Sequence, residues 1–79
     1  MPRTLNDPRH EALRVFLVEK RLKARLTQHQ MAKVIRRNQS YVATIETGQR
    51  RVDAVELMEL ADALGFTIAE AYRRMGDVK

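Results

Sequence analysis

The chain has 79 residues, of which 44% are hydrophobic and 32% charged, with two prolines, three glycines and no cysteine. A chain of this length has room for one hydrophobic core, which excludes a two-domain enzyme. Without cysteine, disulfide frameworks, thiol catalysis and cysteine-based zinc sites are excluded as well. The longest apolar run covers only residues 15–18, far fewer than the roughly 20 residues of a membrane helix. We therefore expect residues 1–79 to form one soluble, cytoplasmic domain.

Charge is distributed unevenly along the chain. Residues 1–51 contain 12 Lys and Arg against 4 Asp and Glu, whereas residues 52–79 contain 3 against 6, and the net charge is +5. Such a layout suits a protein with one face for a polyanion and another for solvent or a second subunit. Solvated basic faces are also common, so composition alone leaves nucleic-acid binding open.

Helical periodicity and capping residues predict five helices, and no segment alternates between apolar and polar residues as a strand does. The first helix is predicted from Pro8 to about Ala24, because Asp7 is a favourable N-cap and proline is favoured at the first helical position. Residues 1–6 are expected to form a flexible arm. The predicted fold class is all-α.

The four later helices are also marked by capping residues, whose side chains accept hydrogen bonds from backbone N–H groups. The helices are predicted to begin after Thr27, Asn38, Asp53 and Thr67. Gly48 and Gly65 are expected to end the third and fourth helices in a left-handed conformation. The second and third helices, residues 28–35 and 39–46, are too short to persist alone, so packing against the other helices must hold them.

Apolar residues recur at helical spacing and predict one buried face for each helix. The expected core consists of Leu13, Phe16, Leu17, Ala24, Met31, Ala32, Ile35, Val42, Ile45, Leu57, Leu60, Ala61, Leu64, Ile68, Ala71, Tyr72 and Met75. The first helix also carries a second apolar stripe, Val15, Val18 and Leu22, almost opposite to its core face. This stripe is either covered by the ends of the chain or forms a dimer or partner surface.

Two short capped helices joined by residues 36–38 have the spacing of a helix-turn-helix motif. The most informative segments are Leu26-Thr27-Gln28, Met31-Ala32, Gln39-Ser40-Tyr41-Val42, Ile45-Glu46-Thr47-Gly48, Arg50-Arg51-Val52-Asp53, Glu56-Leu57 and Leu60-Ala61-Asp62-Ala63-Leu64-Gly65. In these segments the chain resembles the Cro/CI-like (lambda repressor-like, XRE-type) helix-turn-helix DNA-binding family, over about half of its length and at the family's spacing. The resemblance implies a five-helix lambda repressor-like domain with its helix-turn-helix at residues 27–48.

The resemblance also implies a DNA interface. The third helix would lie in the major groove, with Gln39, Ser40 and Thr44 contacting base edges. Phosphate contacts are expected from Thr27, Gln28, Arg36, Arg37, Tyr41, Gln49, Arg50 and Arg51. Tyr41 has a second interpretation, packing beneath the turn. Arg21 and Glu46 match an arginine–carboxylate bridge of the phage repressors and are expected to pair.

The chain departs from the family at two positions where glycine is common, Arg25 and Arg36. If the backbone stays left-handed there, each arginine costs about 1 kcal/mol, which we expect phosphate affinity to offset. Arg37 stands where the turn is often apolar. The geometry of this turn is therefore the part of the resemblance that the sequence supports least.

We expect a non-enzymatic transcriptional regulator, a homodimeric repressor that binds an inverted repeat in double-stranded DNA with half-sites about 34 Å apart. The dimer surface is expected either at residues 66–79, through Phe66, Ile68, Tyr72 and Met75, or at the second stripe of the first helix. The alternative function is a protein-interaction module of antitoxin or anti-activator type on the same scaffold.

No residues point to a cofactor, a metal or catalysis. His10 and His29 lack neighbours at metal-ligand spacing. Glu56, Glu59 and Asp62 alternate with leucines on the fourth predicted helix, which indicates a solvated face rather than paired catalytic carboxylates.

Overall fold

The computed structural model describes residues 7–77, so the arm expected at residues 1–6 and the last two residues lie outside the described part. Between residues 7 and 77 the chain forms helices and no strand. The five helices are α1 (Pro8–Lys23), α2 (Gln28–Val34), α3 (Gln39–Glu46), α4 (Ala54–Leu64) and α5 (Ile68–Gly76). The predicted all-α, five-helix fold is confirmed.

Each helix begins at its predicted cap. The carboxylate of Asp7 accepts a hydrogen bond from the backbone N–H of Arg9, and Asn38 accepts from that of Tyr41. Reciprocal capping boxes open the other three helices, at Thr27, Asp53 and Thr67. Because these hydrogen bonds are local, the helix starts are set by nearby sequence. The end of α2 lies one residue before the predicted one.

Among residues 7–77, four adopt left-handed backbone conformations. Gly48 and Gly65 have φ angles of 81° and 76°, and Arg25 and Arg36 have φ angles of 62° and 59°. The backbone has thus kept the geometry that glycine favours at both arginine positions, at a cost of about 1 kcal/mol each. The turn between α2 and α3 therefore includes a left-handed residue even though Arg36, not glycine, occupies that position.

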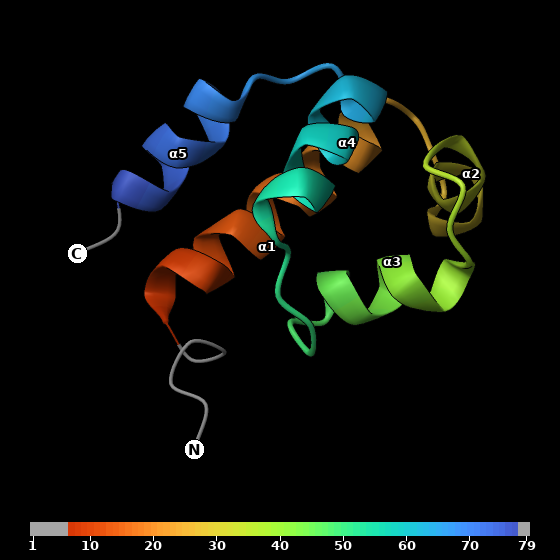
Figure 1. Ribbon diagram of the computed structural model, residues 1–79, viewed down its shortest axis with the longest axis horizontal. Helices are drawn as coiled ribbons and strands as arrows, with labels where there is room; N and C mark the ends of the chain where they lie inside the picture. Colours follow the sequence, from red (N-terminus) through yellow and green to blue (C-terminus); the bar gives the residue numbers. More distant parts are fainter. Residues whose placement is uncertain (1–6, 78–79) are drawn as a thin grey trace.

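The helices pack around α1, which runs through the middle of the molecule, with α2 and α3 on one side and α5 on the other (Figure 1). The core consists of Leu13, Phe16, Leu17, Met31, Ala32, Val42, Ile45, Leu60, Ala61, Leu64, Phe66 and Ala71. The rings of Phe16 and Phe66 meet edge to face with centroids 4.9 Å apart. Of the two short helices, α2 packs against α3, and α3 in turn packs against α1.

The burial pattern corrects several expectations. Phe66, placed on a possible dimer surface, is only 5% exposed because it packs on Phe16. Ala24, Ile68 and Tyr72 are exposed rather than part of the core. Glu56, interpreted as solvated, is buried.

Candidate nucleic-acid interface

The N-terminal part of α3 presents polar side chains while the opposite face of the helix is buried. Gln39 and Ser40 are exposed, and Val42 and Ile45 are in the core. Thr44 is half-buried, and its hydroxyl donates to the backbone carbonyl of Tyr41 at 2.9 Å. The predicted base-contacting residues thus comprise two exposed side chains and a third that is partly covered.

A buried carboxylate, Glu46, anchors the C-terminal end of α3. The Nε of Arg21 lies 2.7 Å from Glu46 Oε2, and its Nη2 donates to Oε1 at 3.1 Å. Arg21 also donates to the backbone carbonyl of Leu26 at 2.8 Å. Both side chains are nearly buried, so this bidentate pair fastens α3 to α1 and to the start of the helix-turn-helix.

The same carboxylate is connected to the exposed end of α3. The side-chain amide of Gln28 donates to Glu46 Oε1 at 2.9 Å, and Gln39 Nε2 donates to Gln28 Oε1 over 3.4 Å. We call Arg21, Glu46, Gln28 and Gln39 the Glu46 cluster. Through it, a predicted phosphate-contacting residue and a predicted base-contacting residue are positioned by one buried group.

A second buried carboxylate, Glu56, lies where α3, the loop after it and α4 meet. Arg50 Nη2 lies 2.9 Å from Glu56 Oε2, and Arg37 Nη1 lies 3.8 Å from the same oxygen. The guanidinium carbons of Arg37 and Arg50 stand 4.6 and 4.9 Å from the ring centroid of Tyr41. We call Glu56, Arg37, Arg50 and Tyr41 the Glu56 cluster.

The electrostatics of the Glu56 cluster follow from this geometry. Hydrogen bonding to Arg50 holds the pKa of Glu56 below its ordinary value. Burial, together with the nearby Glu56 carboxylate, raises the pKa of Tyr41 to about 12. At neutral pH the cluster therefore contains one carboxylate, two guanidinium groups and a neutral phenol.

Sequence reasoning missed the role of Glu56, although one signal was present. Glu56 completes the capping box of α4 by accepting from the backbone N–H of Asp53 at 3.0 Å. That bond turns its side chain back toward the preceding loop, where Arg50 Nη1 donates to the same oxygen at 3.0 Å. The capping pattern thus favoured a carboxylate directed at the loop.

The predicted phosphate-contacting residues fall into two sets. Gln28, Arg37, Tyr41 and Arg50 make contacts within the protein, in the Glu46 and Glu56 clusters. The second set, Thr27, Arg36, Gln49 and Arg51, lies outside both clusters and is exposed. Of these, Thr27 uses its hydroxyl oxygen to cap α2. The structure brings the residues around the N-terminal half of α3 together, whereas Gln49 and Arg51 follow its C-terminal end.

Both candidate dimer surfaces expose fewer of their apolar side chains than the sequence predicted. On α5, Ile68 and Tyr72 are 42% and 74% exposed, Met75 is half-buried against the core, and Phe66 is lost to it. On α1, Leu22 is 59% exposed, while Val15 and Val18 are half-buried. Tyr72 is therefore the largest apolar side chain that either surface offers.

A family model described as a helix-turn-helix domain matches residues 12–73, which include α2, α3, α4 and both carboxylate clusters. The chain belongs to this helix-turn-helix family. No curated protein sequence shows a significant match to it.

Solved structures agree with the family assignment. An XRE-family like protein from Pseudomonas syringae pv. tomato str. DC3000 is 29% identical, with a TM-score of 0.82 over 95% of this chain and 92% of that chain. The clp gene regulator ClgR from Corynebacterium glutamicum is 24% identical, with a TM-score of 0.78 over 89% of this chain and 90% of that chain. A further ClgR structure is 25% identical with the same TM-score, covering 87% and 73%. The resemblance to the XRE-type helix-turn-helix family is confirmed.

Two further properties of the described residues concern metal binding and membrane spanning. Among residues 7–77, no group of three or more His, Asp or Glu side chains is arranged to hold a metal ion. Across the same residues, none of the helices combines the length and the apolar character needed to cross a membrane.

Proposed function

We propose that this protein is a sequence-specific DNA-binding transcriptional regulator, not an enzyme, and that α3 enters the major groove. The observation that carries the proposal is the exposed polar start of α3, tied by Gln28 to the buried Arg21–Glu46 pair. Residues 20–45 around it contain no acidic residue, which favours a polyanionic partner. Family membership and the match to an XRE-family like protein support the same function.

Gln39 is the principal base-contacting residue in this proposal. Its amide donates one N–H to Gln28, which leaves its second N–H and its carbonyl oxygen free. That donor and acceptor match the N7 and N6 groups that adenine presents in the major groove. Ser40 and Thr44 add hydroxyl contacts, which discriminate less between bases.

Phosphate contacts would come from both sides of α3. Thr27, Gln28, Arg36 and Arg37 lie on or near α2, and the loop after α3 contributes Gln49, Arg50 and Arg51. A guanidinium group has five N–H donors, so Arg37 and Arg50 can bind Glu56 and still donate to a phosphate. Tyr41 supports both arginines from its ring face and need not contact DNA itself.

We further propose a homodimer that binds an inverted repeat with half-sites about 34 Å apart and represses transcription by covering a promoter. The face of α5 with Ile68 and Tyr72 is the better dimer surface, because Tyr72 is large and 74% exposed. Residues 1–79 then act as one domain, with the helix-turn-helix at residues 27–48. A protein partner at Leu22 of α1 is the alternative, since this side chain is 59% exposed beside Val15 and Val18.

Selection from a random duplex DNA pool tests the proposal. We expect a palindromic consensus whose affinity falls with salt and is reduced at least tenfold by Gln39→Ala. Met58→Ala, which changes an exposed residue of α4, is the matched control and should bind like the wild type. A pool that shows no enrichment would refute DNA specificity and favour the interaction module.

A further inference from the structure

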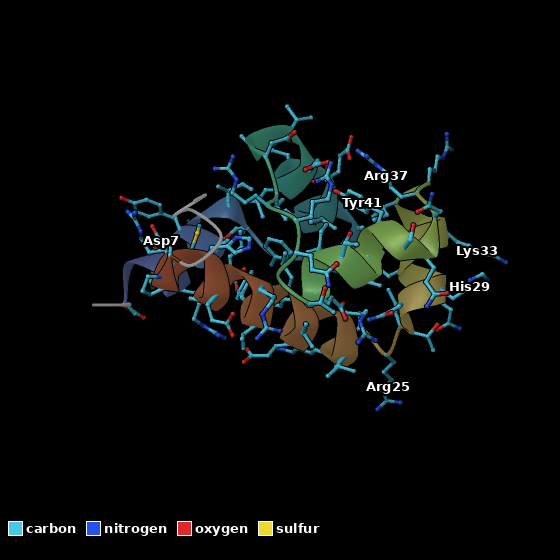
Figure 2. All side chains as sticks on the ribbon, turned by 90° about the horizontal axis from the view of Figure 1, so that it is seen from below. Asp7, Arg25, His29, Lys33, Arg37 and Tyr41 are labelled. Carbon is cyan, nitrogen blue, oxygen red and sulfur yellow. The ribbon has the colours of Figure 1, made fainter. Side chains whose placement is uncertain are left out.

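The outer face of α2 and the turns that flank it carry a row of basic side chains. His29 and Lys33 are one helical turn apart on α2, with Arg25 before the helix and Arg36 after it. All four are exposed. Figure 2 shows Arg25, His29 and Lys33 projecting outward from the end of the molecule that α2 forms, beside α3. We call these four residues the α2 strip.

Folding pairs most other cations of the described chain with carboxylates. The paired residues are Arg9, Arg14, Lys20, Arg21, Arg37, Arg50 and Arg74. Arg25, Lys33 and Arg36 have no carboxylate within ion-pair distance among residues 7–77, and neither have Lys23, Arg51 and Arg73 elsewhere on the surface. The α2 strip therefore keeps its positive charge open to solvent.

Two members of the strip are held in an unfavourable backbone conformation. Arg25 and Arg36 have φ angles of 62° and 59°, where glycine would fit without strain. Neither guanidinium group makes a hydrogen bond within residues 7–77. What arginine adds at these positions is an outward positive charge, and strained residues of this kind concentrate at functional sites.

We propose that the α2 strip is a second phosphate-binding surface, which contacts the DNA backbone beyond the segment of major groove that α3 occupies. This inference rests on the proposed function and adds Arg25, His29 and Lys33 to the interface. The strip adjoins that interface, because His29 follows Gln28, which contacts Gln39. It contains no Trp, Tyr or Phe that could serve as a large buried anchor of a protein interface, which favours DNA over an acidic protein.

The test compares salt dependence on two duplexes. A duplex carrying the selected site is used either trimmed flush with its half-sites or extended by about one helical turn at each end, and affinity is measured by fluorescence anisotropy at several KCl concentrations. The slope of log K against log salt is negative, and each lost phosphate contact reduces its magnitude by about 0.9. On the extended duplex we expect the magnitude of this slope to fall per protomer by about 2 for Arg25→Gly/Arg36→Gly and by about 1 for Lys33→Gln. On the trimmed duplex the double variant should lose only the Arg36 contact that the proposed function already includes, and Lys33→Gln should match the wild type.

The controls separate this inference from folding and from the proposed function. Because glycine relieves the left-handed strain, the double glycine variant should melt at or above the wild-type temperature. Arg73→Gln removes an exposed charge from α5 and should leave the slope unchanged. Wild-type slopes retained by the strip variants on the extended duplex would overturn the inference, whereas failure of the wild type to bind any selected duplex would overturn the proposed function itself.

Discussion

The two buried carboxylates, Glu46 at the end of α3 and Glu56 in the first turn of α4, are paired with arginine in different ways. Glu46 is held by Arg21, whose side chain is only 13% exposed, and by the amide of Gln28. Glu56 is held by Arg50 and Arg37, whose side chains are 42% and 35% exposed. The Glu46 cluster is therefore closed to solvent at its ion pair, and the Glu56 cluster is open.

Because of this difference, one cluster only supports the fold, whereas the other can also contact a ligand. A closed pair fixes the position of α3 but has no free charge to offer a ligand. An open pair is screened by water and contributes less stability, yet its arginines remain accessible to an anion. The two clusters therefore predict a graded series of effects on stability.

The largest effect is expected for Glu46→Ala. The change leaves Arg21 buried without its counter-charge, which typically costs about 3–5 kcal/mol. Urea unfolding monitored by circular dichroism measures this loss, with Glu59→Ala on the exposed surface as the control. If both variants lost the same small amount, Glu46 would not be the anchor of α3.

A smaller loss, about 2 kcal/mol, is expected for Glu56→Ala. The backbone N–H of Asp53 loses its acceptor, whereas Arg37 and Arg50 can turn toward water. Glu56→Gln keeps an acceptor for Asp53 and should recover about half of the loss in the same unfolding experiment. A loss from Glu56→Ala as large as that from Glu46→Ala would show that both clusters are closed.

The pH dependence of the Glu56 cluster should be visible in alkaline solution. The pKa of Tyr41 is about 12 in the folded state, against 10 ordinarily, so the unfolded chain releases its proton first. Stability should therefore fall between pH 10 and pH 12, by about 1 kcal/mol for this half-buried phenol. Tyr41→Phe should remove this component from thermal melts taken at several pH values, and Tyr72→Phe should retain it.

The smallest effect is expected for the exposed pair of Arg37 and Glu59, which lie 3.1 Å apart. A double-mutant cycle with alanine at both positions should give a coupling of about 0.5 kcal/mol or less. Raising the salt concentration to about 1 M should abolish it. A coupling above about 2 kcal/mol would mean that Arg37 is locked into the fold and unavailable to a ligand.

Local signals account for what could be predicted from the sequence. The starts of all five helices are set by side chains that cap backbone N–H groups within three residues, so no tertiary information was needed. The pairing expected between Arg21 and Glu46, 25 residues apart, came from family resemblance and is present in the structure. Composition and periodicity alone do not specify a contact of that range.

Phe66 and Glu56 are two of the residues whose burial was predicted wrongly, and both lie beside an end of α4. Gly65 turns the chain at the end of α4, and the N–H of Phe66 then donates to the carbonyl of Ala61, which directs Phe66 into the core. A helical projection stops at the end of a helix and does not include this reversal. The same projection treated α4 as isolated and so left Glu56 in solvent. DNA contacts themselves stay a prediction for Gln39, Ser40 and Thr44.

The hydrogen bonds of Arg21 also bear on how modular this motif is. One guanidinium group on α1 binds the carbonyl of Leu26 before α2 and the carboxylate of Glu46 at the end of α3. Helices as short as α2 and α3 are not stable as isolated segments. Residues 27–48, transplanted alone into another protein, would leave their anchor behind, so the transferable unit of this fold includes α1.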